Sequence, residues 1–401
     1  MGKYSKATEL LYQGTEVKGM DFYKPLVVPY YSTTAFKMQN LAEVREVVEK
    51  RFSYVRFSNP NREVLAETVS FLEEGEKSLI YASGMGAITS TLLTLLNPGE
   101  EVICNSNIYG ETYEVMTEIL PKFGIKTTLV DFCDTENARQ AMTPNTRMIY
   151  TEVCCNPALK MADIPALAEL AHANNALLMV DNTFTTNIAI RPITLGADII
   201  INSMTKFMNG HSDAISGSIT SRKEIIDKLD HFRPLFGTSG DPYASFTMYK
   251  NFGTMDLRVR RQMYNAAKLA EALEKHPNVV KVNHPSLESF HQHDLAMRLF
   301  KDKETMSGML SIVLPEALAP HEATAYVDKF TMSLNFVHYA STLGGIHTTL
   351  MHPVTSSHAD VPDDKRRAMG ITPGMIRISC GIENTDDLIT EFTQALDKIY
   401  D

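Results

Sequence analysis

Residues 78–221 alternate short apolar runs with amphipathic stretches of helical length. The seven runs are SLIYAS, EVICN, KTTLVD, RMIYTEV, ALLMVD, DIIINS and GSIT, and residues 162–174 between two of them have apolar positions at helical spacing. Strands that are apolar on both faces and joined by helices form a parallel sheet covered on both sides. The pattern therefore predicts a mostly parallel α/β sheet of seven strands, with ligands at the carboxyl ends of the strands.

The pattern changes after about residue 250. A long helical stretch precedes the apolar runs VVKVNH, LSIVL, FVHYAS and MIRIS, and a last helical stretch follows them. The first sixty or so residues are rich in tyrosine and lack a clear period. Because 401 residues exceed one ordinary core, we expect an N-terminal arm at residues 1–60 that contacts a neighbouring subunit, a large domain at residues 61–250 and a smaller α+β domain at residues 251–401.

Composition narrows the class of protein. Hydrophobic residues make up 44% of the chain and charged residues 21%, which is typical of a globular protein. The net charge of −10 disfavours nucleic acid as a partner. No apolar run approaches the roughly 18 residues of a membrane span, and the chain does not open with the apolar region of a signal peptide. The five cysteines form no C-x-x-C pair, which disfavours a zinc site or a disulfide framework and predicts a cytoplasmic protein.

Two charged residues follow neighbouring apolar runs. Asp181 ends ALLMVD, and Lys206 comes shortly after DIIINS. Adjacent parallel strands would place both side chains at one rim of the sheet, where ligands bind. Burial there would lower the pKa of the lysine, as Schiff-base chemistry requires. On these two residues alone, an ion pair beside a surface loop explains the pattern equally well.

A third feature is the run SLIYASGMGAITS, in which a strand leads through Gly84 and Met85 into a helix. Small residues at such a junction let backbone N–H groups approach a phosphate at the helix N-terminus. The run lacks the G-x-G-x-x-G and P-loop fingerprints, so by itself it indicates only a turn.

Other patterns favour different interpretations. Ser203 and Lys206 form an S-x-x-K string, which would make Ser203 the nucleophile of an acyl-serine enzyme, but neither S-D-N nor K-T-G occurs. Met297, Met306 and Met309 indicate an adaptable apolar core rather than a copper site. No metal site is predicted.

Several short motifs occur in order along nearly the whole chain. They are Tyr54-Val-Arg56-Phe-Ser-Asn-Pro60, Ala82-Ser-Gly-Met-Gly-Ala87, Ile108-Tyr-Gly110, Asn156-Pro157, Val180-Asp181-Asn182-Thr183-Phe184, Ser203-Met204-Thr205-Lys206-Phe207, Gly210-His211-Ser212-Asp213, Leu343-Gly-Gly345, His352-Pro353 and Met375-Ile-Arg-Ile-Ser379. Together they resemble the Cys/Met-metabolism family of PLP-dependent enzymes, which includes cystathionine γ-lyase, cystathionine γ-synthase and methionine γ-lyase. The resemblance implies pyridoxal 5′-phosphate (PLP) as cofactor, the aspartate-aminotransferase-like fold type I, and a homotetramer built as a dimer of dimers.

The resemblance also implies roles for individual residues. Lys206 would bind PLP covalently and later transfer protons, and Asp181 would pair with the pyridinium nitrogen so that the ring accepts electrons. The phosphate would be held by Gly84, Met85, Ser203 and Thr205. Tyr54 and Arg56 of a neighbouring subunit would complete that phosphate site, so that active sites are shared between subunits.

Three further residues would contact the ring or the substrate. Tyr109 would stack on the ring and could protonate a leaving group, and Asn156 would hydrogen-bond the phenolic oxygen of the ring. Arg377 would bind the substrate α-carboxylate. An ordinary structural role is open for each: a core aromatic for Tyr109, a turn residue for Asn156 and a strand-end surface charge for Arg377.

Departures from the family pattern bear on the small amino-acid substrate. Glu111 stands where cystathionine γ-lyases usually have glycine and methionine γ-lyases have cysteine. If Glu111 faces the substrate, it favours a cationic distal end, as in cystathionine or canavanine; at a helix N-terminus it would face solvent instead. Ser341 stands where cystathionine enzymes tend to have glutamate, which weakens a strict cystathionine assignment. With Thr342, it would contact the substrate.

The resemblance implies a lyase that catalyses γ-elimination on a homoserine-derived amino acid of the methionine, cystathionine or canavanine type. The alternatives are γ-replacement, as in cystathionine γ-synthase or O-acyl-homoserine sulfhydrylase, and β-elimination from cystathionine or cysteine. A scaffold kept only for binding or regulation is disfavoured, because the expected base Lys206 and the expected carboxylate-binding Arg377 occur together.

Overall fold

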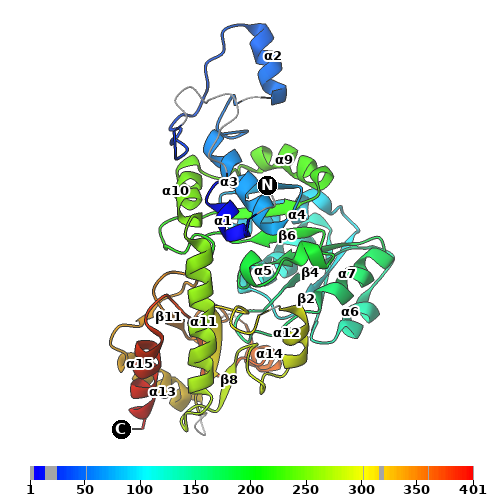
Figure 1. Ribbon diagram of the computed structural model, residues 1–401. Coiled ribbons are helices and arrows are strands. Elements are labelled where there is room, and N and C mark those ends of the chain that lie inside the picture. Colours follow the sequence, from blue (N-terminus) through cyan, green and yellow to red (C-terminus); the bar gives the residue numbers. More distant parts are fainter. Residues whose placement is uncertain are drawn as a thin grey trace.

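The computed structural model describes residues 4–13, 25–50, 52–300, 302–315, 320–359 and 361–400. These residues contain a seven-stranded sheet and a five-stranded sheet. Figure 1 shows helices packed around the sheets, with α11 (Met255–Leu273) running from one to the other. Every helix among these residues is too short or too polar to span a bilayer.

The large sheet contains the strands that the sequence predicts. They are β1 (Lys77–Tyr81), β2 (Glu101–Asn105), β3 (Lys126–Val130), β4 (Thr146–Glu152), β5 (Leu177–Asp181), β6 (Ile199–Asn202) and β7 (Gly217–Ser221). Their order is β1-β7-β6-β5-β4-β2-β3. β7 runs antiparallel to β1 and β6, whereas the other neighbours are parallel. The predicted mostly parallel seven-stranded sheet is therefore confirmed.

Helices flank both sheets. The remaining helices are α1 (Lys6–Leu10), α2 (Leu41–Lys50), α3 (Pro60–Glu73), α4 (Gly84–Leu95), α5 (Gly110–Glu114), α6 (Thr135–Ala141), α7 (Ile164–Ala173), α8 (Thr186–Ala189), α9 (Lys223–Phe236), α10 (Pro242–Phe252), α12 (His293–Leu299), α13 (Pro320–Met332), α14 (Asp363–Ala368) and α15 (Thr385–Asp397). Shorter turns are one π-helical turn (Val115–Ile119) and three 3-10 turns (Leu120–Phe123, Pro192–Leu195 and Pro353–Thr355). α7 matches the predicted helical stretch and begins where Asp163 caps it by accepting a hydrogen bond from the N–H of Ala166.

Both faces of the large sheet are buried. Along β5, Leu178 and Val180 pack into one core and Met179 packs into the other. Helices α3 and α7 belong to the first core, and α4 and α9 belong to the second. This alternation is what a pleated strand covered on both sides requires, and it explains why the sequence shows continuous apolar runs.

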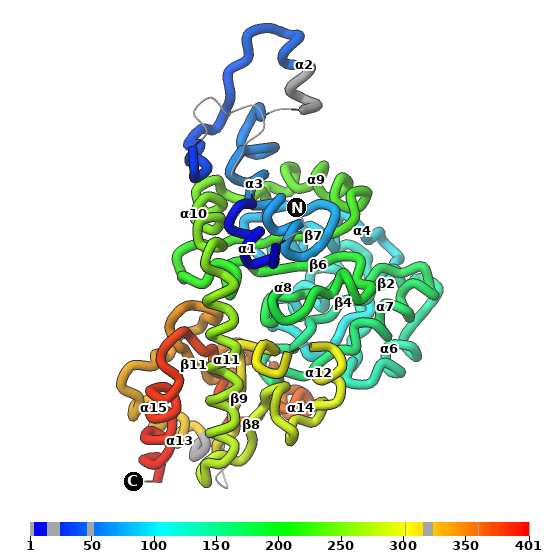
Figure 2. The backbone as a smooth tube through the Cα atoms, in the orientation of Figure 1, coloured from blue at the N-terminus to red at the C-terminus, as the bar shows by residue number. Residues whose placement is uncertain are grey.

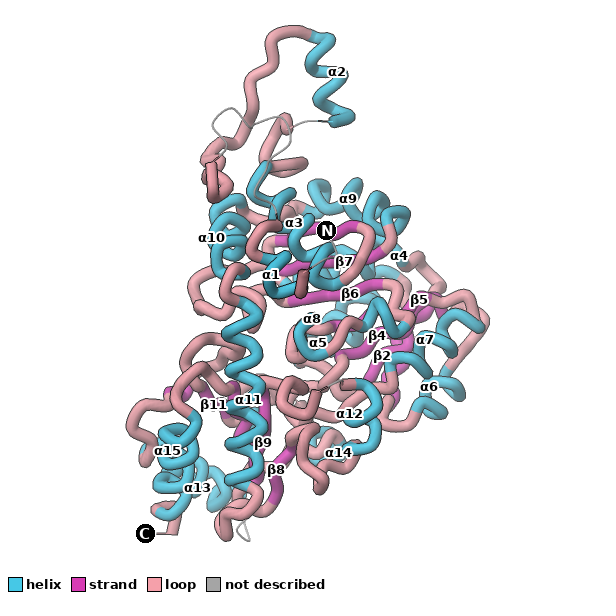
Figure 3. Tube along the Cα trace, in the orientation of Figure 1, coloured by secondary structure: helices cyan, strands magenta, loops and turns pink. Residues whose placement is uncertain are grey.

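The smaller sheet has the order β10-β11-β12-β9-β8. Its strands are β8 (Lys281–Asn283), β9 (Met309–Val313), β10 (His338–Tyr339), β11 (Thr349–Met351) and β12 (Met375–Ser379). β10 pairs with β11 in parallel, and the other neighbours are antiparallel. The sequence predicts all of these strands except β11, whose three residues Thr349–Met351 lie outside the predicted apolar runs. Figure 3 shows this group of strands beside α11 and apart from the strands of the large sheet.

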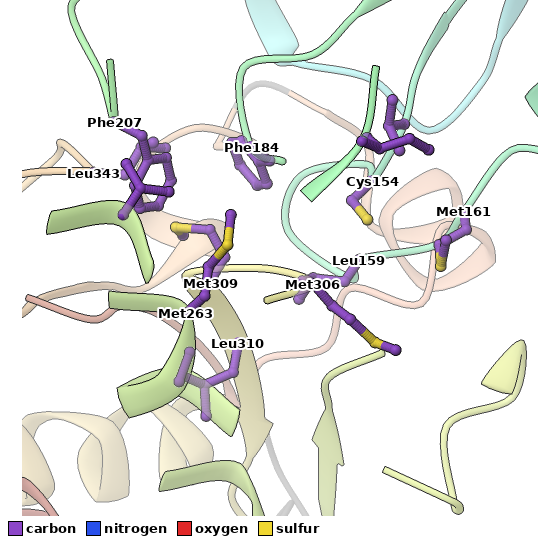
Figure 4. Packing of buried hydrophobic residues seen from close by; sticks show 14 of the residues in the cluster. Cys154, Leu159, Met161, Phe184, Phe207, Met263, Met306, Met309, Leu310 and Leu343 are labelled. Atoms are coloured by element: carbon purple, nitrogen blue, oxygen red, sulfur yellow. The ribbon is translucent and has the colours of Figure 1, made fainter. Parts of the chain in front are cut away.

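The expected methionine-rich core is partly right. Met306 and Met309 are buried in the same core as Phe207 (Figure 4). Met297 is 37% exposed, so the expectation is wrong for this residue. The reason is its place on α12, which buries Leu299 and leaves Met297 on its outer side.

In the N-terminal region, the described residues 4–13, 25–50 and 52–58 are irregular apart from two helices. α1 packs against α3 and buries Leu10. This region includes α2, which the sequence pattern did not predict, and Figure 2 shows residues 25–45 extending away from the rest of the chain. Leu26 and Leu41 are 89% and 77% exposed, which is typical of a contact surface. The subunit contact and the domain boundaries near residues 60 and 250 stay predictions.

Candidate active site

A cavity of about 420 Å³ lies at the carboxyl ends of β4, β5 and β6. The first turns of α4 and α5, the loop at residues 341–343 and β12 form its other sides. Its wall contains all but two of the predicted site residues: Gly84, Met85, Tyr109, Glu111, Asn156, Asp181, Ser203, Thr205, Lys206, Ser341, Thr342 and Arg377. A cavity of this size suits a small ligand.

Two carboxyl groups form the floor of the cavity. Asp181 ends β5 and is the register partner of Glu152, which ends β4. Asp181 accepts a hydrogen bond from the backbone N–H of Thr183 at 2.9 Å. Burial raises the pKa of Asp181, and burial together with the nearby Asp181 raises the pKa of Glu152 to about 8. A cation bound beside these carboxyl groups would offset the cost of burying them.

Glu152 is a site residue that the sequence analysis missed. Its carboxylate accepts hydrogen bonds from the backbone N–H groups of Tyr109 at 2.7 Å and Asn156 at 3.2 Å. Glu152 therefore fixes the backbone at two predicted site residues. The signal that identifies Asp181 partly applies to Glu152, because Glu152 is the last residue but one of the apolar run RMIYTEV, while Asp181 is the last residue of ALLMVD.

The N-terminus of α4 faces the same cavity. Ser83 caps this helix by accepting a hydrogen bond from the N–H of Gly86 at 3.0 Å. The N–H groups of Gly84 and Met85 lie in the first turn, where a helix offers them no internal partner. An added Cβ at Gly84 would lie only 2.9 Å from the Cβ of Ser203, so only glycine lets the two segments meet. The helix end and the Ser203 hydroxyl form a cradle that suits a phosphate.

Lys206 lies just beyond β6 and faces the cavity. Burial is the main cause that lowers its pKa; the charge of Arg377 lowers the pKa further, and Glu111 opposes the shift. An amine with a lowered pKa is a better nucleophile and base near neutral pH. The pKa of Asp181 is raised, whereas an ion pair with Lys206 would lower it, which argues against the surface ion pair.

The loop at residues 341–345 packs directly on the Lys206 segment. Gly344 has a φ of 79°, and an added Cβ there would lie 2.3 Å from the backbone nitrogen of Phe207. Gln262 of α11 donates a hydrogen bond to the carbonyl oxygen of Gly344 at 3.1 Å. Glycine is therefore required at this position, and α11 holds the C-terminal loop against the lysine.

β12 places Arg377 in the cavity wall, where it is only 5% exposed. Its Nη1 donates to the Oδ1 of Asn156 at 3.1 Å, and its Nη2 donates to the carbonyl oxygen of Thr342 at 3.0 Å. Its Nε is buried without a hydrogen-bond partner among the described residues. Burial lowers the pKa of Arg377 to about 10, which leaves it cationic at neutral pH. This buried guanidinium is no surface charge, and it suits a carboxylate ligand.

α5 begins between Tyr109 and Glu111. Burial raises the pKa of Tyr109 and the Glu111 carboxylate raises it further, so the phenol keeps its proton at neutral pH. Glu111 is solvent-exposed and lies in the first turn of α5, yet it also lines the cavity. Glu111 therefore lies at a helix N-terminus in contact with solvent and also lines the cavity, because this helix N-terminus forms the edge of the cavity.

Two serines that the sequence analysis did not single out complete this edge. Ser356 and Ser357 follow the 3-10 turn at Pro353–Thr355 and line the cavity. An added Cβ at Gly110 would lie 2.7 Å from the carbonyl oxygen of Ser357, so the serine loop and α5 touch. No local pattern marks these serines, because only the contact between distant chain segments brings them to the site.

Tyr54 and Arg56 do not line the cavity of their own chain. Tyr54 is 43% exposed. Arg56 donates a hydrogen bond to the carbonyl oxygen of Pro234 at 3.2 Å, and its guanidinium lies 4.9 Å from the ring centre of Phe57. Their predicted contact with the phosphate site of a neighbouring subunit stays a prediction.

The donor set of the cavity fits PLP. The carboxylate of Asp181 suits a protonated ring nitrogen, and the first turn of α4 suits a phosphate. The amine of Lys206 suits a covalent link to an aldehyde, and Arg377 offers a cation to an amino-acid carboxylate.

Comparison with known proteins agrees with this geometry. Residues 7–397 match the family of Cys/Met metabolism PLP-dependent enzymes. The chain is 35% identical to L-methionine gamma-lyase of Fusobacterium nucleatum subsp. polymorphum, with 99% of each chain covered, and 35% identical to cystathionine gamma-lyase of Bacillus subtilis, with 93% and 94% covered. The crystal structure of cystathionine gamma synthase from Xanthomonas oryzae pv. oryzae superimposes with a TM-score of 0.92 at 28% identity, with 99% of each chain covered. The acyl-serine interpretation of Ser203 is thereby set aside, and the chain belongs to the Cys/Met metabolism PLP-dependent enzymes, with their α/β fold type I.

Proposed function

We propose that this enzyme is a γ-lyase. It acts on a homoserine-derived amino acid of the methionine, cystathionine or canavanine type and releases the γ-substituent, 2-oxobutanoate and ammonia with the uptake of water. The observation that carries the proposal is the meeting of Lys206, Asp181 and Arg377 in one cavity, with Glu111 at its edge. PLP, when bound, supplies the electron sink that makes the substrate Cα–H acidic.

The floor of the cavity would hold the cofactor. Asp181 would pair with the ring nitrogen, which also offsets the burial that raises its pKa. The first turn of α4, with the hydroxyls of Ser203 and Thr205, would bind the phosphate. Asn156 would donate its amide N–H to the phenolic oxygen, which is compatible with its Oδ1 accepting from Arg377.

The remaining residues would bind the substrate and move protons. Arg377, with Ser341 and Thr342 beside it, would bind the α-carboxylate. Lys206, freed by the substrate amine, would remove the Cα proton, as its lowered pKa favours. Tyr109 would stack on the ring and donate its proton to the leaving group, for which its raised pKa keeps it protonated.

Glu111 is the residue that would select among γ-substituents. Its carboxylate lines the same cavity as the hydroxyl-bearing Ser356 and Ser357, and this combination favours a cationic or hydrogen-bond-donating distal group. Apolar side chains, including Leu343 and Met351, also line the cavity and suit the chain of the substrate. This combination supports a substrate such as cystathionine or canavanine, with methionine as the neutral alternative.

We also infer that the enzyme is a cytoplasmic homotetramer in which pairs of subunits share active sites. All five cysteines have free thiols, as expected in a reducing compartment. The exposed Tyr54 and the extended segment at residues 25–45 support a contact with a neighbouring copy. The arm would end near residue 60, and the C-terminal domain would begin near residue 251.

Product analysis tests the proposed reaction. Cystathionine should give 2-oxobutanoate and cysteine; pyruvate and homocysteine would instead identify the β-elimination alternative. An O-acyl-homoserine with added cysteine should still give 2-oxobutanoate as the main product, whereas conversion to cystathionine would identify the γ-replacement alternative. Methionine, cystathionine, cysteine and canavanine are compared at equal concentration. Failure of methionine, cystathionine and canavanine alike to yield 2-oxobutanoate would contradict the proposal, and pyruvate from cysteine alone would identify β-elimination.

A further inference from the structure

A buried carboxylate lies outside the cavity, behind the strand ends that form the cavity floor. Glu73 is the last residue of α3 and is 0% exposed. Its Oε1 accepts a hydrogen bond from the side-chain amide of Asn202 at 2.8 Å, and its Oε2 accepts one from the side-chain amide of Asn182 at 3.4 Å. Glu73 therefore connects the ends of β5 and β6 to α3.

The two asparagines are the chain neighbours of proposed site residues. Asn182 directly follows Asp181, and Asn202 directly precedes Ser203. Successive side chains of a strand point to opposite faces, and both amides reach the α3 side of the sheet. Glu73 thus holds the two strand ends from the α3 side of the sheet and does not itself line the cavity.

The strand ends are also linked to each other. The backbone N–H of Asn182 donates to the carbonyl oxygen of Ile201 at 2.8 Å, and the N–H of Ser203 donates to the hydroxyl of Thr183 at 2.8 Å. The N–H of Thr183 in turn donates to Asp181 at 2.9 Å. A shift of one strand end would therefore be passed to the carboxylate on the cavity floor and to the segment that leads to the lysine.

The charge of Glu73 is stabilised by amides rather than by an ion pair. The nearby cations Lys6 and Arg191 lie at 2.6 Å and 3.6 Å from the carboxylate of the adjacent Glu74. Burial raises the pKa of Glu73 to about 7, and the hydrogen bonds from Asn202 and Asn182 oppose this rise. Burying a carboxylate is unfavourable because it loses its hydration. Such a group is retained where its hydrogen bonds fix a local geometry.

We propose that Glu73 is a positioning residue, which fixes Asp181 and Lys206 against bound PLP by holding Asn182 and Asn202. The inference rests on the proposed function, in which Asp181 and Lys206 contact the cofactor. Glu73 does not line the cavity, so its loss is expected to change how PLP is held rather than which bonds are broken.

The test compares Glu73→Gln with the matched control Glu74→Gln, whose carboxylate is 40% exposed. Glutamine has one acceptor oxygen, so one asparagine amide would face an NH2 group. We expect Glu73→Gln to weaken PLP binding about tenfold, the size expected when a buried donor loses its partner. The pH midpoint of the visible absorption of the Lys206–PLP link should shift by about 0.3 unit or more. The control should leave both values unchanged.

Asn202→Ala provides a second test, which also serves if Glu73→Gln fails to fold. It removes the closer amide and should give a similar shift of the absorption midpoint, and the combined variant should shift little further. A Glu73→Gln or Asn202→Ala protein that binds PLP and absorbs as the wild type does, with only a lower melting temperature, would overturn the inference. A wild-type protein that never takes up PLP would instead overturn the proposed function.

Discussion

The floor and the edge of the cavity are built in different ways. The floor consists of strand ends, where Asp181 and Glu152 are register partners and Lys206 follows the next strand. The edge consists of loops and a helix start, where Glu111 lines the cavity together with Ser356 and Ser357 from the C-terminal part of the chain. A sheet fixes its strand ends through many neighbours, whereas loops can change without disturbing it. We infer that the floor sets the cofactor chemistry and that the edge selects the reaction.

The largest effect is expected at the floor. Lys206 is the only lysine among the described residues that line the cavity, and it would form the covalent link and move the Cα proton. In Lys206→Ala the visible absorption of PLP should therefore shift, and turnover should fall by about a thousandfold or more. Absorption spectra measure the shift of the PLP band, and keto-acid release measures turnover. Lys122→Ala, at an exposed lysine, is the control. A Lys206→Ala enzyme with substantial turnover would contradict the assigned role.

The next largest effect is expected if Arg56 of one subunit completes the phosphate site of another. Arg56→Ala should weaken PLP binding, although Arg56 lies outside the cavity of its own chain. Mixing Arg56→Ala with Lys206→Ala subunits should restore up to roughly a quarter of wild-type turnover, because hybrid dimers contain one intact site. Arg139→Ala mixed with Arg56→Ala provides the control for subunit exchange. Absence of recovery in proven hybrids would show that the site is not shared through Arg56.

The same contrast explains what the sequence could predict. Asp181 and Lys206 were predictable because apolar runs locate strand ends, and Glu152 was within reach of the same rule. Ser356 and Ser357 were not, because they reach the site through the contact of their loop with Gly110, which no local pattern encodes. β11 was missed because its apolar residues are only Leu350 and Met351, set between polar neighbours, whereas longer apolar runs surround β8 and β10. The fold was therefore more predictable than the edge of the cavity.

A smaller effect should appear in the pH dependence of apoprotein stability. The folded pKa of Glu152 is about 8 against an ordinary value of 4.5. Between these values the folded protein holds a proton that the unfolded chain loses, so this group's stabilising contribution is present below pH 4.5 and lost as the pH rises through 8. Glu152→Gln cannot lose a proton, so its melting temperature should fall less from about pH 5 to pH 8. Glu118→Gln, at an exposed glutamate, should behave as wild type. If the melting temperatures of the wild type, Glu152→Gln and Glu118→Gln fell equally between pH 5 and pH 8, the pKa of Glu152 would not be raised by burial.

The smallest effect is expected at the edge, because Glu111 is solvent-exposed and its charge is partly screened there. Glu111→Gln should lower kcat/KM for cystathionine and canavanine by about two- to fivefold, the range of exposed charge pairs, and leave methionine nearly unchanged. Glu114→Gln changes the same helix without altering the cavity wall and is the control. The informative quantity is the ratio of kcat/KM for the cationic substrates to kcat/KM for methionine, because damage to the floor would lower kcat/KM for all substrates together. Equal losses on methionine and on the cationic substrates would therefore move Glu111 from selecting the substrate to supporting the floor.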